Sequence, residues 1–396
     1  MNKILMVATI PGTLRAFILP IARHFRAQGW QVDGMANGIS TCADCVQGFD
    51  RVWDVEWSRN PLDPRNFIIP PQAIQKLVTQ EKYDIVHVHT PVAAFVTRYA
   101  LRNLKKQLNT KVIYTAHGFH FHPGGKLFKN AVFLGLEKLA ARWHDYLVVI
   151  NQDDEQAAKR YRLNRPENIR YMPGIGVDLN YYSPDATHPS EVERVRQELG
   201  LTPETPLLLS VAELNPRKRH QDILQALARL GKPDVCMAFA GEGLQREKLQ
   251  QLAVELGVEN QVRFLGFRYD ITALMRAAAA TVLASEHEGL PRSVMESMCL
   301  EIPVIGAEIR GIRDLLADGC GYLFPVGDVE ALTQAFAHVL TNPEEARFIG
   351  MCGRERMASY DLRHIIKLHE SLYTEAMLAD VASVNLRLSG SSVSMP

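Results

Sequence analysis

Short apolar runs alternate with amphipathic stretches along most of the 396-residue chain. Apolar runs bounded by turn residues indicate buried strands, whereas apolar positions spaced three to four apart indicate helices that pack on one face. The pattern predicts strands at residues 3–8, 85–89, 112–115, 146–150, 169–172, 207–211, 235–240, 262–265, 281–284, 304–307 and 322–324. Helices are predicted between them, for example at residues 13–28, 221–230, 245–256 and 329–340.

Strands that alternate with helices are typical of parallel, doubly wound α/β sheets. The chain is long enough for two hydrophobic cores, so we expect two such domains. The predicted domains span residues 1–180 and 206–360, and a proline-rich connection joins them at residues 181–205. A helix at residues 361–380 and a disordered, serine-rich tail at residues 383–396 are predicted to follow.

The composition is that of an ordinary globular protein, with 44 Lys and Arg against 44 Asp and Glu, which gives no support for nucleic-acid binding. No apolar run reaches the roughly 20 residues that cross a bilayer. The first residues read as a buried strand and not as a leader, so we expect a cytoplasmic protein, and the six cysteines fit that compartment. Cys42 and Cys45 form a C-x-x-C pair without further ligands, which favours loop packing over a zinc site.

One segment is locally basic. Residues 98–142 carry nine basic side chains against Glu137 alone, a net charge of +8. A solvated face and a contact with anionic lipid headgroups are both open interpretations. Residues 119–141 also mix aromatic and aliphatic side chains with lysines. We favour a helix that packs on the core with cationic edges, and keep peripheral membrane binding as a second expectation.

The most informative stretch is residues 285–300, which read Ser-Glu-His-Glu-Gly-Leu-Pro-Arg-Ser-Val-Met-Glu-Ser-Met-Cys-Leu. Pro291 suits a first helical turn, whose N–H groups can bind an anion such as a diphosphate. Glu288 before the helix and Glu296 within it bracket that turn, and carboxylates accept hydrogen bonds from sugar or ribose hydroxyls. Two glutamates at this spacing also arise by chance, with Glu296 then a solvated residue. The accompanying Gly289, Pro291 and apolar strand favour a nucleotide-sugar site.

This stretch resembles the carboxy-terminal signature of the retaining glycosyltransferase family 4. Over most of the chain the resemblance also rests on Gly12, on Thr-Ala-His-Gly at 115–118, on Gly-Val-Asp at 176–178, on Lys218 and on Gly-Glu-Gly at 241–243. The sequence Glu-Gly-Leu-Pro-Arg-Ser is most similar to that of members of the bacterial branch that builds capsule, exopolysaccharide and lipid-linked glycans. The resemblance implies the GT-B fold, in which two Rossmann-like domains face a central cleft and the C-terminal helix crosses back to the first domain.

The resemblance further implies a retaining hexosyltransferase that moves a sugar from a UDP-sugar or another nucleoside-diphosphate sugar to a glycan or polyprenyl-diphosphate-linked acceptor. It implies no metal ion and no cofactor, with the acceptor on the side of the first domain. Lys218, Glu288 and His117 are the implied catalytic residues. The implied donor-binding residues are Gly12, Arg217, Lys218, Gly241, Glu242, Phe267, Arg268, Glu288, Gly289, Leu290, Pro291, Arg292 and Glu296.

A departing diphosphate needs fixed hydrogen-bond donors or cations. The sequence has no convincing Asp-x-Asp loop for a divalent metal, so cationic side chains of Arg217, Lys218 and Arg219 are expected to serve. Many family members carry Arg where this chain has Glu213. Either Arg217 supplies the missing cation or Glu213 turns away, for example toward Arg219.

Histidines are dense in the first half of the chain, at positions 87, 89, 117, 120 and 122. Such a run can bind metal, but no Asp or Glu accompanies it, so we expect none. By resemblance, His117 contacts the transferred sugar, while a purely structural histidine at a strand end is the alternative. We place acceptor and sugar specificity in loops such as residues 34–64.

Three other functions stay open. A sugar-nucleotide epimerase or a phosphorylase can share the same fold, and acceptor dependence separates these enzymes from a transferase. A catalytically inactive subunit that binds a partner transferase is the alternative from another class, and Glu213 is the feature that supports it.

Overall fold

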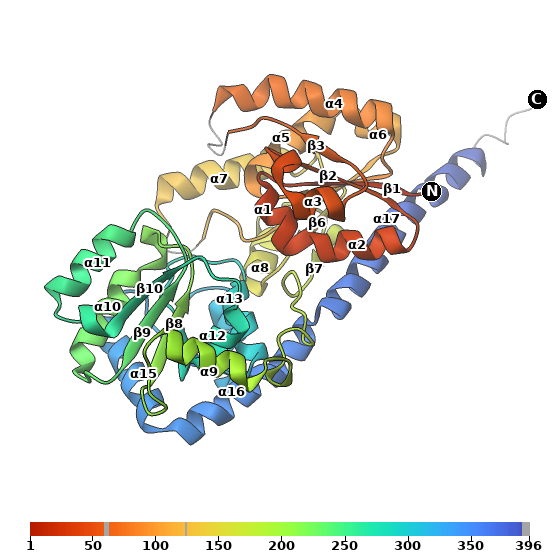
Figure 1. Cartoon of the computed structure of the whole chain (residues 1–396). Coiled ribbons are helices and arrows are strands. Elements are labelled where there is room, and N and C mark those ends of the chain that lie inside the picture. The colour runs from red at the N-terminus through yellow and green to blue at the C-terminus, as the bar shows by residue number, and fades with distance from the viewer. Residues whose placement is uncertain (59–62, 123–124, 390–396) are drawn as a thin grey trace, which may run out of the picture. The chain divides into compact units, whose positions relative to one another are not determined.

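The structure, a computed structural model, describes residues 1–58, 63–122 and 125–389, with side chains as far as residue 378 (Figure 1). The chain divides into two compact units. Unit 1 comprises residues 1–176 and the chain from Arg363 onward, and unit 2 comprises Val177–Leu362. Each unit is built on its own parallel sheet with helices on both faces, as the sequence pattern predicts.

Unit 1 has a seven-stranded sheet in the order β3-β2-β1-β4-β5-β6-β7, and every neighbouring pair is parallel. The chain order reverses beside β1, which is the point of an open α/β sheet where a ligand crevice forms at the carboxyl ends of the strands. The strands are β1 Lys3–Val7, β2 Gln31–Ala36, β3 Val52–Asp54, β4 Ile85–His89, β5 Lys111–Ala116, β6 Tyr146–Val149 and β7 Ile169–Tyr171.

The helices of unit 1 cover both faces of this sheet (Figure 1). One buried cluster includes Leu5 and Val86, and a second includes Ile4 together with Tyr373 of the last helix. The helices are α1 Pro11–Thr13, α2 Leu19–Ala27, α3 Ala43–Gly48, α4 Ile69–Glu81, α5 Pro91–Leu101, α6 Lys105–Leu108, α7 Leu127–Ala140, α8 Gln152–Arg160 and α17 Leu362–Ser389.

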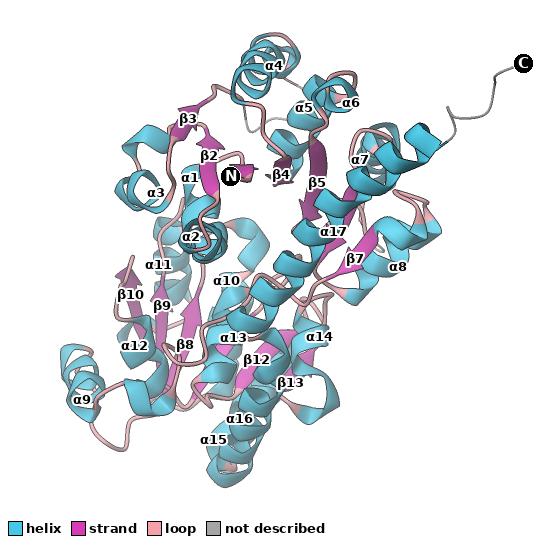
Figure 2. Cartoon of the chain, turned by 90° about the vertical axis from the view of Figure 1, so that its right-hand side faces the viewer, coloured by secondary structure: helices cyan, strands magenta, loops and turns pink. Residues whose placement is uncertain are grey.

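Unit 2 has a six-stranded parallel sheet in the order β10-β9-β8-β11-β12-β13, with the reversal of chain order beside β8 (Figure 2). The strands are β8 Leu207–Val211, β9 Cys236–Ala240, β10 Val262–Gly266, β11 Ala280–Leu283, β12 Val304–Ala307 and β13 Tyr322–Phe324. The helices are α9 Pro189–Glu198, α10 His220–Leu230, α11 Arg246–Glu255, α12 Ile271–Ala277, α13 Arg292–Cys299, α14 Ile312–Leu316, α15 Val329–Thr341 and α16 Pro343–Met357.

Every predicted strand is present, but the sequence pattern missed β2 and β3. Strand β2 contains Asp33 and Gly34, which break an apolar run. Asp33 is fully buried. The strand tolerates this buried carboxylate because it accepts hydrogen bonds from Tyr83 Oη, Trp53 Nε1 and Arg51 Nε. The stretch 34–64, expected to be a specificity loop, therefore begins in a strand and also contains β3 and α3.

Three other expectations need correction. The helix expected at residues 13–28 contains a π-helical turn at Leu14–Ile18. Residues 181–205 are not a simple connection, because they belong to unit 2 and contain α9. Helix α17 continues to Ser389 where disorder was expected, since no Pro or Gly interrupts the sequence before that residue. The rest of the expected tail, residues 390–396, lies outside the described residues.

The basic segment 98–142 is less exposed than its charge indicates. Arg98 is fully buried and bonds Glu137 at 3.1 Å, and Lys105 pairs with Asp145 at 2.7 Å. Helix α7 packs on the core of unit 1 as expected, with Ala140 buried and Phe133 and Leu134 partly buried against the core cluster. Its first turn exposes Leu127 and Phe128, by 88% and 83%. Among the described residues, no helix combines the length and the apolar character that a membrane span requires.

Candidate functional site

The loops that follow β8 and β11 meet beside the reversal of chain order in unit 2. Lys218 comes from the first loop and Glu288 from the second, and Lys218 Nζ lies 2.5 Å from Glu288 Oε1. Both side chains are largely buried. The backbones are joined as well, because the N–H of Glu286 donates to the carbonyl oxygen of Arg217 at 3.0 Å. The structure thus brings together two of the predicted catalytic residues as an ion pair.

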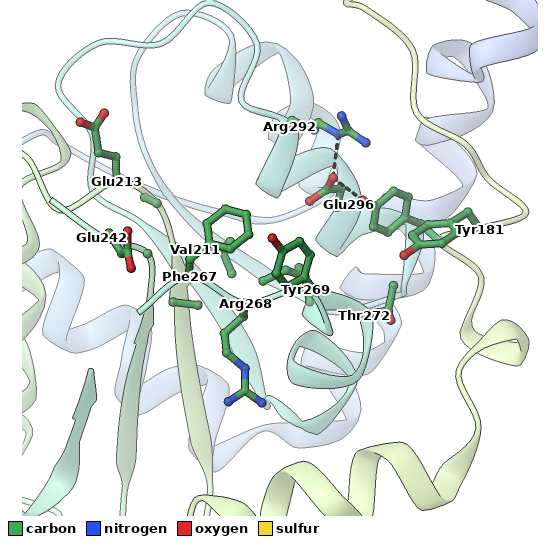
Figure 3. A pocket seen from close by; sticks show the side chains of 15 residues that line it. Tyr181, Val211, Glu213, Glu242, Phe267, Arg268, Tyr269, Thr272, Arg292 and Glu296 are labelled. Atoms are coloured by element: carbon green, nitrogen blue, oxygen red, sulfur yellow. Dashed lines mark hydrogen bonds and ion pairs between the residues drawn. The ribbon is translucent and has the colours of Figure 1, made fainter. Parts of the chain in front are cut away.

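A cavity of about 530 Å³ lies at the carboxyl ends of β8, β9 and β10 in unit 2 (Figure 3). The predicted donor-binding residues that line it come from three separate segments of sequence. They are Gly241, Glu242, Phe267, Arg268, Arg292 and Glu296. Four further lining residues with polar side chains were not predicted, and these are Tyr181, Tyr182, Tyr269 and Thr272.

Glu296 is held firmly at one end of this cavity. Its Oε1 atom accepts hydrogen bonds from Tyr182 Oη at 2.5 Å and from Arg292 Nε at 2.7 Å (Figure 3). The other oxygen, Oε2, has no hydrogen-bond partner among the described residues. Burial raises the pKa of Glu296, and the Arg292 guanidinium and the Tyr182 hydroxyl act in the opposite direction. The buried carboxylate therefore presents one oxygen to a ligand hydroxyl, which is not the solvated glutamate of the chance interpretation.

Two aromatic rings line the same cavity from the loop after β10, and Figure 3 shows them between Glu242 and Glu296. Phe267 and Tyr269 are 56% and 87% exposed, and their ring centroids lie 5.0 Å apart at an interplanar angle of 75°. Exposed apolar rings in a cavity can stack on a planar ligand group such as a nucleobase. Phe267 was predicted for this role, while Tyr269 was missed.

Arg268, between these two rings in sequence, is tied to the protein. Its guanidinium bonds both Glu198 and Asp270, with two contacts of 2.8 Å to Asp270. The bonds from Arg268 to Asp270 lower the pKa of Asp270 to about 2, and Arg194 contributes in the same direction. In Figure 3 the Arg268 side chain extends away from the rings of Phe267 and Tyr269. Arg268 therefore shapes the loop, and its charge is already compensated by two carboxylates.

Glycines hold the loops of this site in place. A Cβ atom on Gly241 would lie 2.0 Å from the carbonyl oxygen of Ala212, so the absence of a side chain lets the two loops touch. Gly311, which was not predicted, has the same function for the turn at Gly289, because its Cβ would lie 1.9 Å from the carbonyl oxygen of that residue. The missing side chain at Gly241 thus serves packing between loops, and ligand access is not needed to explain it.

The loop after β8 departs from one expectation. Glu213 accepts a hydrogen bond from Asn215 Nδ2 at 3.0 Å, and Arg219 pairs instead with Asp222 at 2.6 Å. A contact between Glu213 and Arg219, named as an example under one of the two alternatives, is therefore not formed. Glu213 lines the cavity, whereas the exposed Arg217 does not line it.

The turn that precedes α13 leads into a helix as predicted, but Pro291 caps this helix and does not lie in its first turn. Helix α13 begins at Arg292, and Pro291 is the residue before it. The first N–H groups of a helix have no partner within it, so this end can donate to an anion. The side chains of Leu290 and Pro291 are buried, so only their backbones are available to a ligand.

Gly12 lies in unit 1 and lines a second cavity, of about 560 Å³, together with Arg15, Asn37 and Trp57. A Cβ atom on Gly12 would meet only Ile10 Cδ1, at 3.8 Å. Packing within the unit therefore does not require glycine here, which agrees with the expectation that a ligand approaches the backbone at this residue.

His117 follows β5 in unit 1 and is half-buried. Its Nε2 atom lies 3.1 Å from Nδ1 of the buried His89, and its ring stacks on Phe17 with the centroids 6.0 Å apart. Burial lowers the pKa of His117 to about 4, with a further contribution from His369. The imidazole is therefore neutral near pH 7. Among the described residues, no group of three or more His, Cys, Asp and Glu side chains could hold a metal ion.

Two family models together match most of the chain. The model of glycosyl transferases group 1 matches residues 191–356, and that of glycosyltransferase family 4 matches residues 16–181. With two Rossmann-like units and a site at the carboxyl ends of the strands, the protein is a glycosyltransferase of the GT-B fold. It belongs to glycosyltransferase family 4, as the sequence motifs predicted.

Individual relatives agree with this assignment. A Bacillus subtilis protein named as a glycosyltransferase, EpsD, is 34% identical over 383 residues, which are 96% of this chain and 98% of that protein. The UDP-Gal:α-D-GlcNAc-diphosphoundecaprenol α-1,3-galactosyltransferase of Escherichia coli is 26% identical and covers 67% of this chain and 69% of its own. The crystal structure of Anabaena HepE in complex with UDP-glucose has a TM-score of 0.78, 23% identity, and coverage of 94% of this chain and 100% of HepE.

Proposed function

We propose that this protein transfers a sugar from a UDP-sugar to a glycan or polyprenyl-diphosphate-linked acceptor in the synthesis of a cell-surface polysaccharide. One observation carries the proposal: the cavity of unit 2 combines two exposed aromatic rings with a fixed carboxylate that keeps one oxygen for a ligand. A planar base can stack on such rings, and the hydroxyls of a ribose can donate hydrogen bonds to such a carboxylate.

Relatives support the choice of donor and acceptor. The E. coli relative is named for a UDP-galactose donor and a diphosphoundecaprenol-linked acceptor. HepE, which shares the fold, has been solved with UDP-glucose. Neither protein identifies the sugar or the linkage for this chain, so the proposal names only the class of donor and acceptor.

The reaction breaks the bond between the anomeric carbon and the diphosphate and forms a bond from that carbon to an acceptor hydroxyl oxygen. We assign Lys218, with Arg217 and the backbone N–H groups at the start of α13, to stabilise the charge on the departing diphosphate. Glu288 orients hydroxyls of the donor sugar, Glu296 binds the ribose, and His117 contacts the transferred sugar.

In this scheme the proton of the acceptor hydroxyl passes to the diphosphate. Retention of the anomeric configuration is inferred from membership of the family. In the proposal, the cations of the loop after β8 take the place of a metal ion. In this scheme Lys218 stabilises the departing diphosphate and Glu288 orients the sugar. Their ion pair therefore joins the residues that act on the two parts separated by the cleavage.

We also propose that the enzyme binds the inner face of the cytoplasmic membrane, where a lipid-linked acceptor lies. The α7 tip, defined as residues 126–129, carries the highly exposed Leu127 and Phe128 between Lys126 and Lys129. Apolar side chains flanked by cations suit the interface of an anionic bilayer.

The experiment has two stages. Thermal stabilisation of the purified protein by UDP-, GDP- and ADP-sugars identifies the donor, and UDP-sugars are expected to raise Tm most. Transfer is then measured with and without a lipid-linked acceptor, with and without a chelator. Product that requires the acceptor and survives chelation supports the proposal. Three outcomes contradict the proposal, and each indicates one of the alternatives. Epimerisation without acceptor indicates an epimerase, a requirement for free phosphate indicates a phosphorylase, and the absence of donor binding indicates an inactive subunit. Loss of turnover with the chelator contradicts the metal-independent scheme.

A further inference from the structure

The bond between His89 and His117 lies entirely within unit 1 and joins the ends of two adjacent strands. His89 is the last residue of β4 and is 1% exposed, whereas His117 follows β5 and is half-buried. The two ring nitrogens, His89 Nδ1 and His117 Nε2, lie 3.1 Å apart. One of them must carry the proton of this hydrogen bond, and the arrangement permits two tautomers.

The second nitrogen of His89 distinguishes the tautomers. His89 Nε2 is closed off from solvent and has no hydrogen-bond partner among the described residues. If His117 donated the bond, neutral His89 would carry its proton on Nε2, as a buried N–H without an acceptor. Such a group is destabilising, and orphaned N–H groups are rarer than orphaned acceptors. The structure therefore favours His89 Nδ1–H as the donor and His117 Nε2 as the acceptor.

The surroundings keep both rings neutral, so each ring carries its one N–H proton on either Nδ1 or Nε2. His87 and His369 lie close by, with the His87 ring centroid 4.2 Å from that of His89 and 5.8 Å from that of His369. Burial and these neighbouring rings lower the pKa of His89 well below its ordinary value. His87 is itself fixed, because its nitrogens bond Tyr373 Oη at 2.6 Å and Thr115 Oγ1 at 2.7 Å.

The consequence falls on the other nitrogen of His117. When Nε2 accepts from His89, the proton of the neutral ring is on Nδ1. This Nδ1 atom has no partner among the described residues. Unlike His89 Nε2, it is not closed off from solvent. A ligand that reaches His117 therefore meets an N–H donor.

We propose that His89 is a positioning residue that fixes His117 in the Nδ1–H tautomer, so that His117 donates a hydrogen bond to an oxygen of the transferred sugar. This inference rests on the proposed function only in its last step, the contact with sugar. It also assigns His117 a definite chemistry. A neutral imidazole with its proton on the accessible nitrogen cannot accept the acceptor's proton there, so His117 is not the general base.

The tautomer can be observed without activity. Two-bond ¹H–¹⁵N correlation spectra of the full chain with ¹⁵N-labelled histidine show which ring nitrogen is protonated, and a His117→Asn variant assigns the signals. We expect a protonated Nδ1 and a bare Nε2 for His117 at pH 7.5. A protonated Nε2 overturns the proposal, whatever the activity.

Two variants then test the role of His89. His89→Phe keeps a ring of similar size without nitrogens, and His89→Asn keeps an N–H donor near the position of Nδ1. We expect His89→Phe to broaden or shift the His117 signals to a tautomer mixture and to lower kcat about tenfold, the effect of one hydrogen bond. The KM for donor should change little, and His89→Asn should restore most of kcat.

His144→Phe is the matched control, because His144 is buried in the same unit but bonds Arg98 and Ala140. It should lower stability without changing the His117 spectrum. If His89→Phe leaves the spectrum and kcat as in the wild type, the proposal is wrong. If the wild-type protein transfers no sugar at all, the proposed function fails, while the spectra still decide the tautomer.

Discussion

The two units share a parallel sheet with the same reversal of chain order, yet they present different chemistry at the carboxyl ends of their strands. Unit 2 presents ions in pairs, such as Lys218 with Glu288 and Arg292 with Glu296. Unit 1 presents neutral rings, with His117 held by His89. The ionic site is encoded largely in a short stretch around residue 290, whereas the histidine site depends on β4, β5 and burial. The comparison teaches that one fold can stabilise charge in one unit and offer neutral hydrogen bonds in the other.

The largest effect is expected from the ionic side of the comparison. Lys218→Ala removes a cation beside the proposed diphosphate and leaves Glu288 without its partner. We expect kcat to fall about 10²–10³-fold, as for other preorganised charge-stabilising groups. Arg229→Ala is the control, since Arg229 lies exposed on α10 and is 3.8 Å from Glu330. Steady-state kinetics in which Lys218→Ala retains most of the wild-type turnover would show that unit 2 does not depend on this charge.

Acidification should lower the stability of unit 1 more than that of unit 2. Burial lowers the pKa values of five histidines in unit 1, at positions 87, 89, 117, 144 and 369, and of His220 in unit 2. The folded-state pKa of His369 is about 4, below its ordinary value of 6.5. Above pH 6.5 both states are neutral. Between about pH 6.5 and 4 only the unfolded state takes up the proton, so stability is lost as the pH falls through this window.

For His369 alone this loss is about 3 kcal/mol, since one pKa unit corresponds to about 1.4 kcal/mol. All four tryptophans, at positions 30, 53, 57 and 143, belong to unit 1, so their fluorescence reports its unfolding. We expect the urea midpoint read by tryptophan to fall steeply from pH 7 to pH 5. An unchanged midpoint would contradict the neutral, buried state of these rings.

A smaller effect is expected at Glu296, the proposed ligand of the ribose. Tyr182→Phe removes one of the two donors that fix Glu296 Oε1. We expect UDP binding in a calorimetric titration to weaken about tenfold, in the range of one hydrogen bond to a charged group. Tyr181→Phe removes the hydroxyl of the neighbouring cavity residue and should leave the affinity near that of the wild type. Equal affinities for all three proteins would indicate that Glu296 needs no support from Tyr182.

The smallest effect is expected for the membrane. Replacing both Leu127 and Phe128 of the α7 tip with Ser should reduce co-sedimentation with anionic phospholipid vesicles severalfold, because it removes exposed apolar area. Leu244→Ser, at a 97% exposed position in unit 2, is the control. Equal binding by the two variants would remove the α7 tip from the proposal.

The strand pattern predicted nearly all of the fold, because buried parallel strands are apolar along their whole length. It failed at β2, where the buried Asp33 is acceptable only through partners far away in sequence. The site shows the same limit. Glu288 and Glu296 stand in one motif and were found, whereas Tyr182 and Gly311 act through contacts with Glu296 and Gly289 that no local pattern records. The ion-pair partners of Arg268 were hidden for the same reason.

Hydrogen–deuterium exchange with and without UDP tests the central claim, that the cavity of unit 2 receives the nucleotide of the donor. The account predicts slower exchange at the segments that line this cavity, around residues 211–213, 240–242, 267–272 and 292–296. Saturating UDP that protects only unit 1, or protects no segment of the chain, would contradict it.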